Sequence, residues 1–468
     1  MTGRRAQPRS TKPQAVFLPA GKLEYATWLL LTSSTLLGGW SFFSGRDNLL
    51  ALLALVALLF ALWPARHEAH FFLRTHVLIA AVLVIGAVPL LYLVKLPIDL
   101  IAQLPGRYTM LQPALEQLGP DRWIALSLSS EDTWQAWLKW LPPVAIFVAA
   151  VKLPQAARAR LLGLVIGVAL LQGFLGLAQM SADSQSALRF YGSDEAYRAS
   201  GTFANRSHYA SFLVLCLPLF AKLGHSGGWS RSDSTGARLT GILGLLIVVL
   251  AVLASRSRAG VFLMLLEGLV VGIWLLIRGS SMSRLVGTVA ALFIMLAVIL
   301  PFASGNLLGG FEIGHLGSRI DLFRRGFDAA RQFFPVGAGP GTFSSVFSSF
   351  DSLETLDNVY INRAHNDAIE LVFEAGLLGV FLYAACVALV ASALWRYART
   401  PANSADSVRW LCALGLSMLL LHGLVDYPMR TPSIAVLAML FLAQIMAAPS
   451  TEHPRFIGRQ PARDSSRP

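Results

Sequence analysis

Apolar runs that are long enough to cross a lipid bilayer as helices constrain the fold of this chain more than any other feature. Two examples lie at 49–62 and 285–302. About twenty apolar residues cover the hydrocarbon core of a bilayer as one helix, whereas in water such runs would need an unusually large core. Over 468 residues, 55% are apolar and only 14% are charged, which agrees with a bilayer setting. We therefore predict an all-α, polytopic transmembrane helical bundle.

The prediction divides the chain into three parts. A basic cytoplasmic segment (1–23) precedes the transmembrane domain (24–448), and a disordered cytoplasmic tail (449–468) rich in Pro, Arg and Ser follows it. About twelve spans are expected from the apolar runs. They lie at 24–43, 49–63, 76–96, 137–151, 161–180, 208–222, 239–254, 259–277, 285–302, 367–395, 410–426 and 431–448.

Basic residues concentrate in alternate loops and so orient the chain. About 22 Lys and Arg against about 5 Asp and Glu fall on the side that holds both termini, which the positive-inside rule makes cytoplasmic. We expect a bacterial inner membrane. The net charge of +12 is explained by this orientation, so membrane lipids are expected as partners and nucleic acid is not.

Three longer loops are predicted on the periplasmic side, at 97–136, 181–207 and 303–366. The last, between the ninth and tenth spans, is the longest, and ordered loops of this length usually carry function. Its segment 319–334 has Ile320, Phe323, Phe327 and Phe334 at helical spacing, which predicts an amphipathic helix at the interface or capping the bundle. A Gly-rich turn at 337–343 follows. Without a preceding strand, a backbone-shape role is favoured over phosphate binding.

Arginines gather on this mostly acidic side. Arg256 and Arg258 lie in a link too short to clear the interface, and Arg319 and Arg324 lie on the amphipathic segment. A single such arginine is best explained by snorkelling or by an ion pair in the bundle. Together, their guanidinium groups match phosphate oxygens in pairs of hydrogen bonds, so they are candidates for binding a lipid-linked diphosphate.

A second group of candidates lies where the long loop meets the tenth span. His365 is suited to general-base catalysis near neutral pH. Asn366 or Asp367 is placed to cap the following helix, and Asn366 is also a candidate for lining the cavity. Glu374 would lie inside the membrane region, which makes it a candidate catalytic group that orients a His or an Arg. A buried Glu–Arg structural pair is an equally good interpretation of Glu374.

Other polar residues are candidates for lining the same cavity. His422 and Asp426 lie near the periplasmic end of the eleventh span, and Arg198 and Arg206 lie in the second loop. Packing is the default interpretation of His422, and anchoring at the interface is the default for the two arginines.

The chain has no zinc-type ligand spacing, no DxD-like nucleotide-sugar motif, no P-loop and no G-x-S-x-G elbow. We therefore expect chemistry without a metal, a cofactor or a soluble nucleotide. An enzyme whose donor is already activated on a lipid fits this pattern.

Taken together, these motifs resemble the O-antigen ligase and O-antigen polymerase superfamily. The matching pieces run in order over about 160–445, and the ordered set is more specific than any piece alone. They are Gly201-Thr-Phe203-x-Asn205, Ser257-Arg258-Ala-Gly260, Ser318-Arg319, Pro335-x-Gly-x-Gly339-x-Gly-x-Phe343, His365-Asn366, Glu374-x-Gly376-x-x-Gly379, and His422 with Asp426.

The resemblance implies a metal-independent, inverting glycosyltransferase with a membrane-embedded C-type fold. Such enzymes move a glycan from undecaprenyl diphosphate to a hydroxyl acceptor on the periplasmic face. Carried over, Arg258 and Arg319 would hold the diphosphate with Arg256 and Arg324 as further contacts, and His365 would deprotonate or orient the acceptor.

The acceptor stays open at this point. A ligase uses lipid A-core, a polymerase uses another lipid-linked repeat unit, and a related oligosaccharyltransferase uses a protein side chain. The chain lacks a large C-terminal periplasmic domain, which disfavours the last, and we favour a ligase. A non-enzymatic flippase or transporter is the alternative of a different class. It should have polar residues through the full membrane depth, whereas the candidates here lie at one face.

Overall fold

The computed structural model describes residues 21–41, 44–63, 73–118, 121–191, 198–226, 234–278, 313–350, 361–402, 404 and 406–447. Within these ranges the fold is helical, with one small antiparallel sheet. The longer helices are α1 (Lys22–Leu37), α2 (Gly45–Leu62), α3 (Leu73–Tyr92), α6 (Ser130–Lys152), α7 (Gln155–Ala178), α8 (Arg206–Ser226), α9 (Thr235–Ala254), α10 (Arg258–Arg278), α12 (Ile313–Phe333), α14 (Asp367–Tyr397), α15 (Ser407–His422) and α16 (Pro432–Met446).

The predicted helical fold is confirmed. Every predicted span that falls on described residues coincides with a helix, whereas the span predicted at 285–302 lies outside them. Among the described residues, seven helices are long and apolar enough to cross a membrane, namely α2, α3, α7, α8, α9, α10 and α14. Two shorter apolar helices, α15 and α16, accompany them. The total of twelve spans and the exact loop boundaries stay predictions.

Burial differs sharply between these helices and indicates their place in the bundle. In α8, 83% of the apolar window is buried, compared with 17% in α14 and 22% in α3. The difference arises because α8 packs against α7, α9, α10 and α15. Exposed apolar side chains such as Leu91 and Phe381 on the outer helices match the lipid-facing surface of a membrane bundle.

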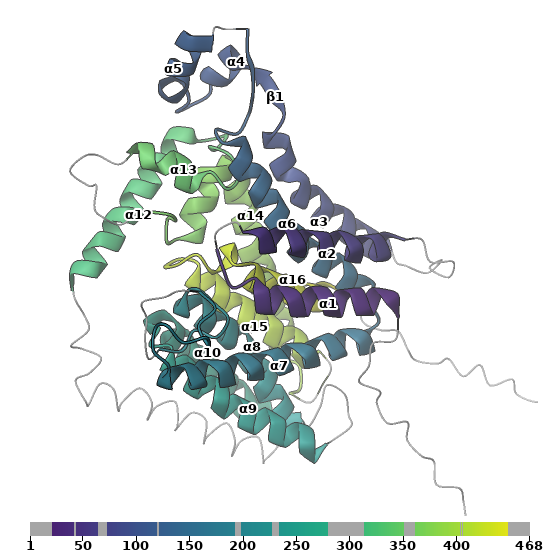
Figure 1. Ribbon diagram of the computed structural model, residues 1–468. Helices are drawn as coiled ribbons and strands as arrows, with labels where there is room; N and C mark the ends of the chain where they lie inside the picture. The colour runs from purple at the N-terminus through teal and green to yellow at the C-terminus, as the bar shows by residue number, and fades with distance from the viewer. Residues whose placement is uncertain are drawn as a thin grey trace, which may run out of the picture.

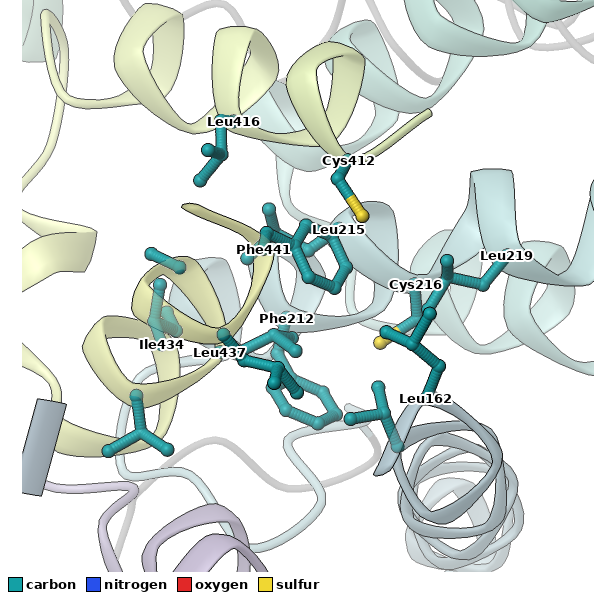
Figure 2. Packing of buried hydrophobic residues seen from close by; sticks show 14 of the residues in the cluster. Leu162, Phe212, Leu215, Cys216, Leu219, Cys412, Leu416, Ile434, Leu437 and Phe441 are labelled. Carbon is teal, nitrogen blue, oxygen red and sulfur yellow. The ribbon is translucent and has the colours of Figure 1, made fainter. Parts of the chain in front are cut away.

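Figure 2 shows the core between α8, α15 and α16, where Phe212, Leu215, Leu437 and Phe441 interdigitate. The cysteines Cys216 and Cys412 are buried in the same region, as free thiols. This core carries the helix ends on which the polar site residues stand.

A small subdomain projects from one end of the bundle, at the top of Figure 1. It consists of β1 (Lys95–Pro97), α4 (Ile98–Ala102), α5 (Tyr108–Leu118) and β2 (Trp123–Ala125), in which β1 and β2 pair antiparallel. Most of it falls in the loop predicted at 97–136, although β1 begins within the span predicted at 76–96, because α3 ends at Tyr92.

The predicted amphipathic helix is confirmed as α12, and it packs against α14. The packed face carries Ala329, Ala330 and Phe333. The apolar side chains at the predicted helical spacing do not form the packed face, because Ile320 and Phe327 are exposed. An exposed apolar stripe beside a cationic helix suits contact with a membrane interface.

The Gly-rich turn shapes the backbone, as predicted, because Gly337, Gly339 and Gly341 all adopt positive φ. Within α14, Gly376 has φ +56° and ψ −130°, which kinks the helix. The amide of Gly339 donates to the carbonyl of Glu374 over 2.9 Å. This backbone amide of the turn therefore holds the kinked segment of α14 that carries Glu374.

Candidate active site

His365 lies just before α14, in a backbone conformation that is uncommon for a residue other than glycine. Its φ is +49°, in the left-handed region, and such conformations persist where surrounding contacts enforce them. The predicted cap is confirmed at Asn366, whose side chain accepts hydrogen bonds from the amides of Ala368 and Ile369, both 3.0 Å. Its Nδ2 atom donates to the carbonyl of Leu424 over 2.8 Å. Asn366 thus joins the start of α14 to the loop after α15 and fixes the position of His365.

Asp426 lies among three histidines that come from different parts of the chain. Its Oδ1 atom is 3.3 Å from Nδ1 of His365 and 3.9 Å from Nε2 of His208, and its Oδ2 atom is 3.8 Å from Nε2 of His422. Asp426, His208 and His422 are buried, whereas the side chain of His365 is 31% exposed. His365 is therefore the histidine of this cluster that a substrate can reach.

Neighbouring groups fix the two buried histidines. Nδ1 of His208 lies 2.8 Å from the hydroxyl of Thr431, and Nδ1 of His422 contacts the hydroxyl of Ser211. The ring of Tyr427 meets His208 edge-on at a centroid distance of 4.8 Å and meets His365 at 4.9 Å.

Among the described residues, no group of three or more His, Cys, Asp and Glu side chains is arranged to hold a metal ion.

The environment of Asp426 determines its charge. Burial raises the pKa of the Asp426 carboxyl, but the hydrogen bond from His365 and the nearby rings of His208 and His422 outweigh this effect, and the pKa lies well below its ordinary value. An ionised carboxylate only accepts hydrogen bonds, so neutral His365 presents the proton on Nδ1 to Asp426 and keeps a lone pair on Nε2. A general base needs this tautomer.

One predicted arginine contacts the loop that holds Asp426. The Nη1 atom of Arg319, on α12, donates to the carbonyl of Val425 over 3.4 Å, next to Asp426. Arg324 lies further along α12 with its side chain exposed, and the described residues show no contact between it and this loop. The structure thus brings Arg319, but not Arg324, to the histidine cluster.

The other predicted pair stands at the turn between α9 and α10. The hydroxyl of Ser257 donates to that of Ser207 over 3.1 Å, which places this turn beside the start of α8, where His208 lies. Arg256 has φ +53°, and the side chains of both Arg256 and Arg258 are exposed. The turn therefore presents two guanidinium groups to the surface at the same end of α8 as the histidine cluster.

Arg198 and Arg206 flank the turn that precedes α8. Two glutamines hold this turn: Gln179 accepts from the amide of Gly201 over 2.8 Å, and Gln172 accepts from that of Thr202 over 2.9 Å. The backbone carbonyl of Arg198 accepts from Arg189 over 3.2 Å. The glycine motif therefore has a structural role, and it sets the start of the helix that carries His208.

Three carboxylates share one face of α14 and meet two arginines. Asp367, Glu370 and Glu374 follow helical spacing. Arg363 lies 2.8 Å from Glu370, and Arg430 lies 2.7 Å from Glu374, 3.3 Å from Glu370 and 3.9 Å from Asp367. Glu374 is thus in a buried ion pair, the arrangement weighed against a catalytic role from the sequence.

The structure brings Arg430, Arg363 and His208 to the site, although sequence analysis assigned none of them a catalytic or phosphate-binding role. Arg430 carries a signal in the sequence, since it follows Asp426 closely in a short segment between two apolar runs. For His208 the signal was its position at the start of a predicted span. Neither signal identifies the partner, because the ion pairs join segments far apart in the chain.

Comparison with known proteins supports the resemblance drawn from the motifs. The model of the O-antigen ligase family matches residues 243–384. This segment contains the turn with Arg258, helix α12, the Gly-rich turn and His365, whereas Asp426 and His208 lie outside it. A search of curated proteins found no match. A family match of this kind implies a glycosyltransferase-like membrane enzyme. Over residues 243–384 the chain carries the sequence pattern of the O-antigen ligase family, and the resemblance inferred from its motifs is confirmed.

Proposed function

We propose that the protein transfers a glycan from undecaprenyl diphosphate to a hydroxyl acceptor at the periplasmic face of the bacterial inner membrane, with both termini in the cytoplasm. The contact between exposed His365 and buried, ionised Asp426 carries this proposal. An accessible histidine stands at the end of a helical bundle, where we expect a lipid-linked substrate to arrive from the membrane. The O-antigen ligase match over 243–384 supports the same class of reaction.

The transfer is a single displacement at the anomeric carbon of the donor sugar. Nε2 of His365 takes the proton of the acceptor hydroxyl while the acceptor oxygen bonds to the anomeric carbon. The bond from that carbon to the diphosphate oxygen breaks, and the electron pair leaves with undecaprenyl diphosphate. Attack opposite the leaving group inverts the configuration. Asp426 stabilises the imidazolium that forms.

The arginines stabilise the departing negative charge. Arg319, beside the Asp426 loop, and Arg258, at the neighbouring turn, are the proposed diphosphate contacts. Arg256 and Arg324 are proposed as further contacts along the path of the phosphates. Glu374 acts through Arg430, as a positioning residue, because its buried pair supports the helix start and the loop that hold His365 and Asp426.

We favour lipid A-core as the acceptor, which makes the protein a ligase. The test uses purified protein in nanodiscs with undecaprenyl-diphosphate-linked glycan, with and without lipid A-core. Transfer to lipid A-core, resolved on a gel, supports the ligase. A ladder of longer lipid-linked glycans without lipid A-core identifies a polymerase instead. Movement of labelled lipid across the bilayer with neither product overturns the enzyme and identifies a flippase.

A further inference from the structure

A cavity of about 260 Å³ is lined by Arg363 and Arg430, the two arginines that pair with the carboxylates of α14. Helix α6 supplies Asp132, Gln135 and Trp140 to its wall, and Ser344 follows the Gly-rich turn. Ligand sites for drug-sized molecules usually enclose about 300–1,000 Å³, so this cavity fits a smaller group. The reaction described above does not use it.

The charges around the cavity argue against a phosphate ligand. Arg363, Arg430 and Lys139 line it, but each arginine is bound to carboxylates of α14 that offset its charge. The Nζ atom of Lys139 donates to the carbonyl of Ser41 over 2.7 Å. Asp132 adds a negative charge, and its Oδ2 atom is buried without a hydrogen-bond partner among the described residues. The Asp132 carboxylate lines the cavity and can accept a hydrogen bond from a ligand hydroxyl or amide.

The remaining lining suits an uncharged sugar. Trp140 offers an aromatic surface, Pro143 and Met429 add apolar contacts, and Gln135 and Ser344 add polar groups. A sugar ring likewise combines apolar C–H surface with hydroxyl groups. Sites for such small molecules pair a mostly apolar lining with a few placed polar groups.

We propose that this cavity is a glycan subsite that holds one uncharged sugar ring, whose hydroxyl donates to Asp132 while its apolar surface packs on Trp140. The proposal rests on the proposed function for its role, because the ring belongs to the donor or to the acceptor glycan. Arg363 lines the cavity and lies two residues before His365, a Cα separation of at most about 7 Å. The cavity therefore adjoins the segment that carries His365, the proposed base.

The first test measures binding and needs no activity. Thermal shifts of the purified protein are recorded with free glucose, galactose, N-acetylglucosamine and glucuronate. A hexose of about twelve non-hydrogen atoms should bind with a Kd of about 2 mM. We expect a saturable shift with at least one neutral sugar and a weaker one with glucuronate. Trp140→Leu and Asp132→Asn should abolish the shift, whereas His365→Ala should keep it.

Trp134→Leu is the matched control, because Trp134 lies on the same helix, is exposed and does not line the cavity. A shift with none of the sugars, or an equal shift in wild type and Trp140→Leu, overturns the subsite. Since this readout is independent of glycan transfer, failure of the proposed function leaves it intact.

The second test assigns the ring to a substrate. In transfer assays, Trp140→Leu should raise one KM about tenfold, the effect of losing one aromatic contact, and change kcat by less than about twofold. A raised KM for the lipid-linked donor assigns the ring to the donor, and a raised KM for the acceptor assigns it to the acceptor. A fall in kcat with both KM values unchanged contradicts the subsite.

Discussion

The Nδ1 atom of His365 lies 3.3 Å from Oδ1 of Asp426, although 61 positions separate the two residues in the chain. The contact exists because Asn366 ties the start of α14 to the loop after α15. The start of α14 therefore supplies the proposed base, and the loop after α15 supplies the carboxylate that orients it.

Replacing Asp426 by Asn tests this pair while keeping the side-chain shape. The exchange removes charged hydrogen bonds worth about 1.5–3 kcal/mol, so kcat should fall about tenfold to a hundredfold. Asn and Asp have nearly equal volumes, so the exchange leaves the packing around position 426 unchanged. An unchanged kcat in Asp426→Asn would show that the carboxylate does not support the base.

The same variant makes a prediction about pH and stability. Because the folded pKa of Asp426 lies well below its ordinary value of 3.8, its stabilising effect is fully present above that value and is lost as the pH falls through the folded pKa. The Tm difference between wild type and Asp426→Asn should therefore stay constant from pH about 5 to 8 and shrink only in stronger acid. A difference that disappears already near pH 6 would contradict the assigned charge.

Arg319→Lys should not behave as a conservative change. Lysine keeps the charge but cannot form the paired hydrogen bonds of a guanidinium, so kcat/KM for the lipid-linked donor should fall about tenfold to a hundredfold. Arg331→Lys is the matched control, since Arg331 is exposed on the same helix and has no proposed role. Equal activity of the two variants would remove Arg319 from the diphosphate site.

The ion pair of Glu374 and Arg430 should contribute strongly to the thermal stability of the protein. Arg430→Gln leaves the buried carboxylate of Glu374 without its partner, which costs about 3–5 kcal/mol. Glu374→Gln leaves Arg430 paired with Glu370 and Asp367, so it should lower Tm less than Arg430→Gln. The double variant should lose less than the sum of the two. Additive losses, measured by thermal unfolding in detergent, would show that the pair is not coupled.

Gly376→Ala tests the kink of α14. Its φ of +56° disfavours a side chain, and an added Cβ would collide with the carbonyl of Pro335. The free energy of unfolding should fall by at least about 2 kcal/mol, and activity should fall with it because the kink positions Glu374. The control is Gly167→Ala on α7, where an added Cβ meets open space. Equal Tm values for the two variants would contradict the structural role of the kink.

Much of the fold follows from local sequence patterns. The apolar runs predicted the helices, because one helix must cover the hydrocarbon thickness with apolar side chains. The cap at Asn366 was also predictable, since a cap depends on residues two or three positions away. The positive φ values of Gly337 and Gly339 likewise follow from the turn sequence.

The partners of the site residues were not predictable in the same way. The sequence left Glu374 between catalysis and an ion pair, and only the packing of α14 on the segment after α15 brings Arg430 to it. The role of His208 depends on where α8 begins relative to Asp426. Both contacts are set by helix packing over long stretches of chain, which a local pattern does not encode.

The rate of glycan transfer by His365→Ala tests the central claim most directly. With undecaprenyl-diphosphate-linked glycan and lipid A-core in nanodiscs, loss of the general base should lower the transfer rate by a factor of about 10²–10⁴, while membrane insertion and Tm stay close to those of wild type. Transfer by His365→Ala at the wild-type rate would contradict the assignment of His365 as the base.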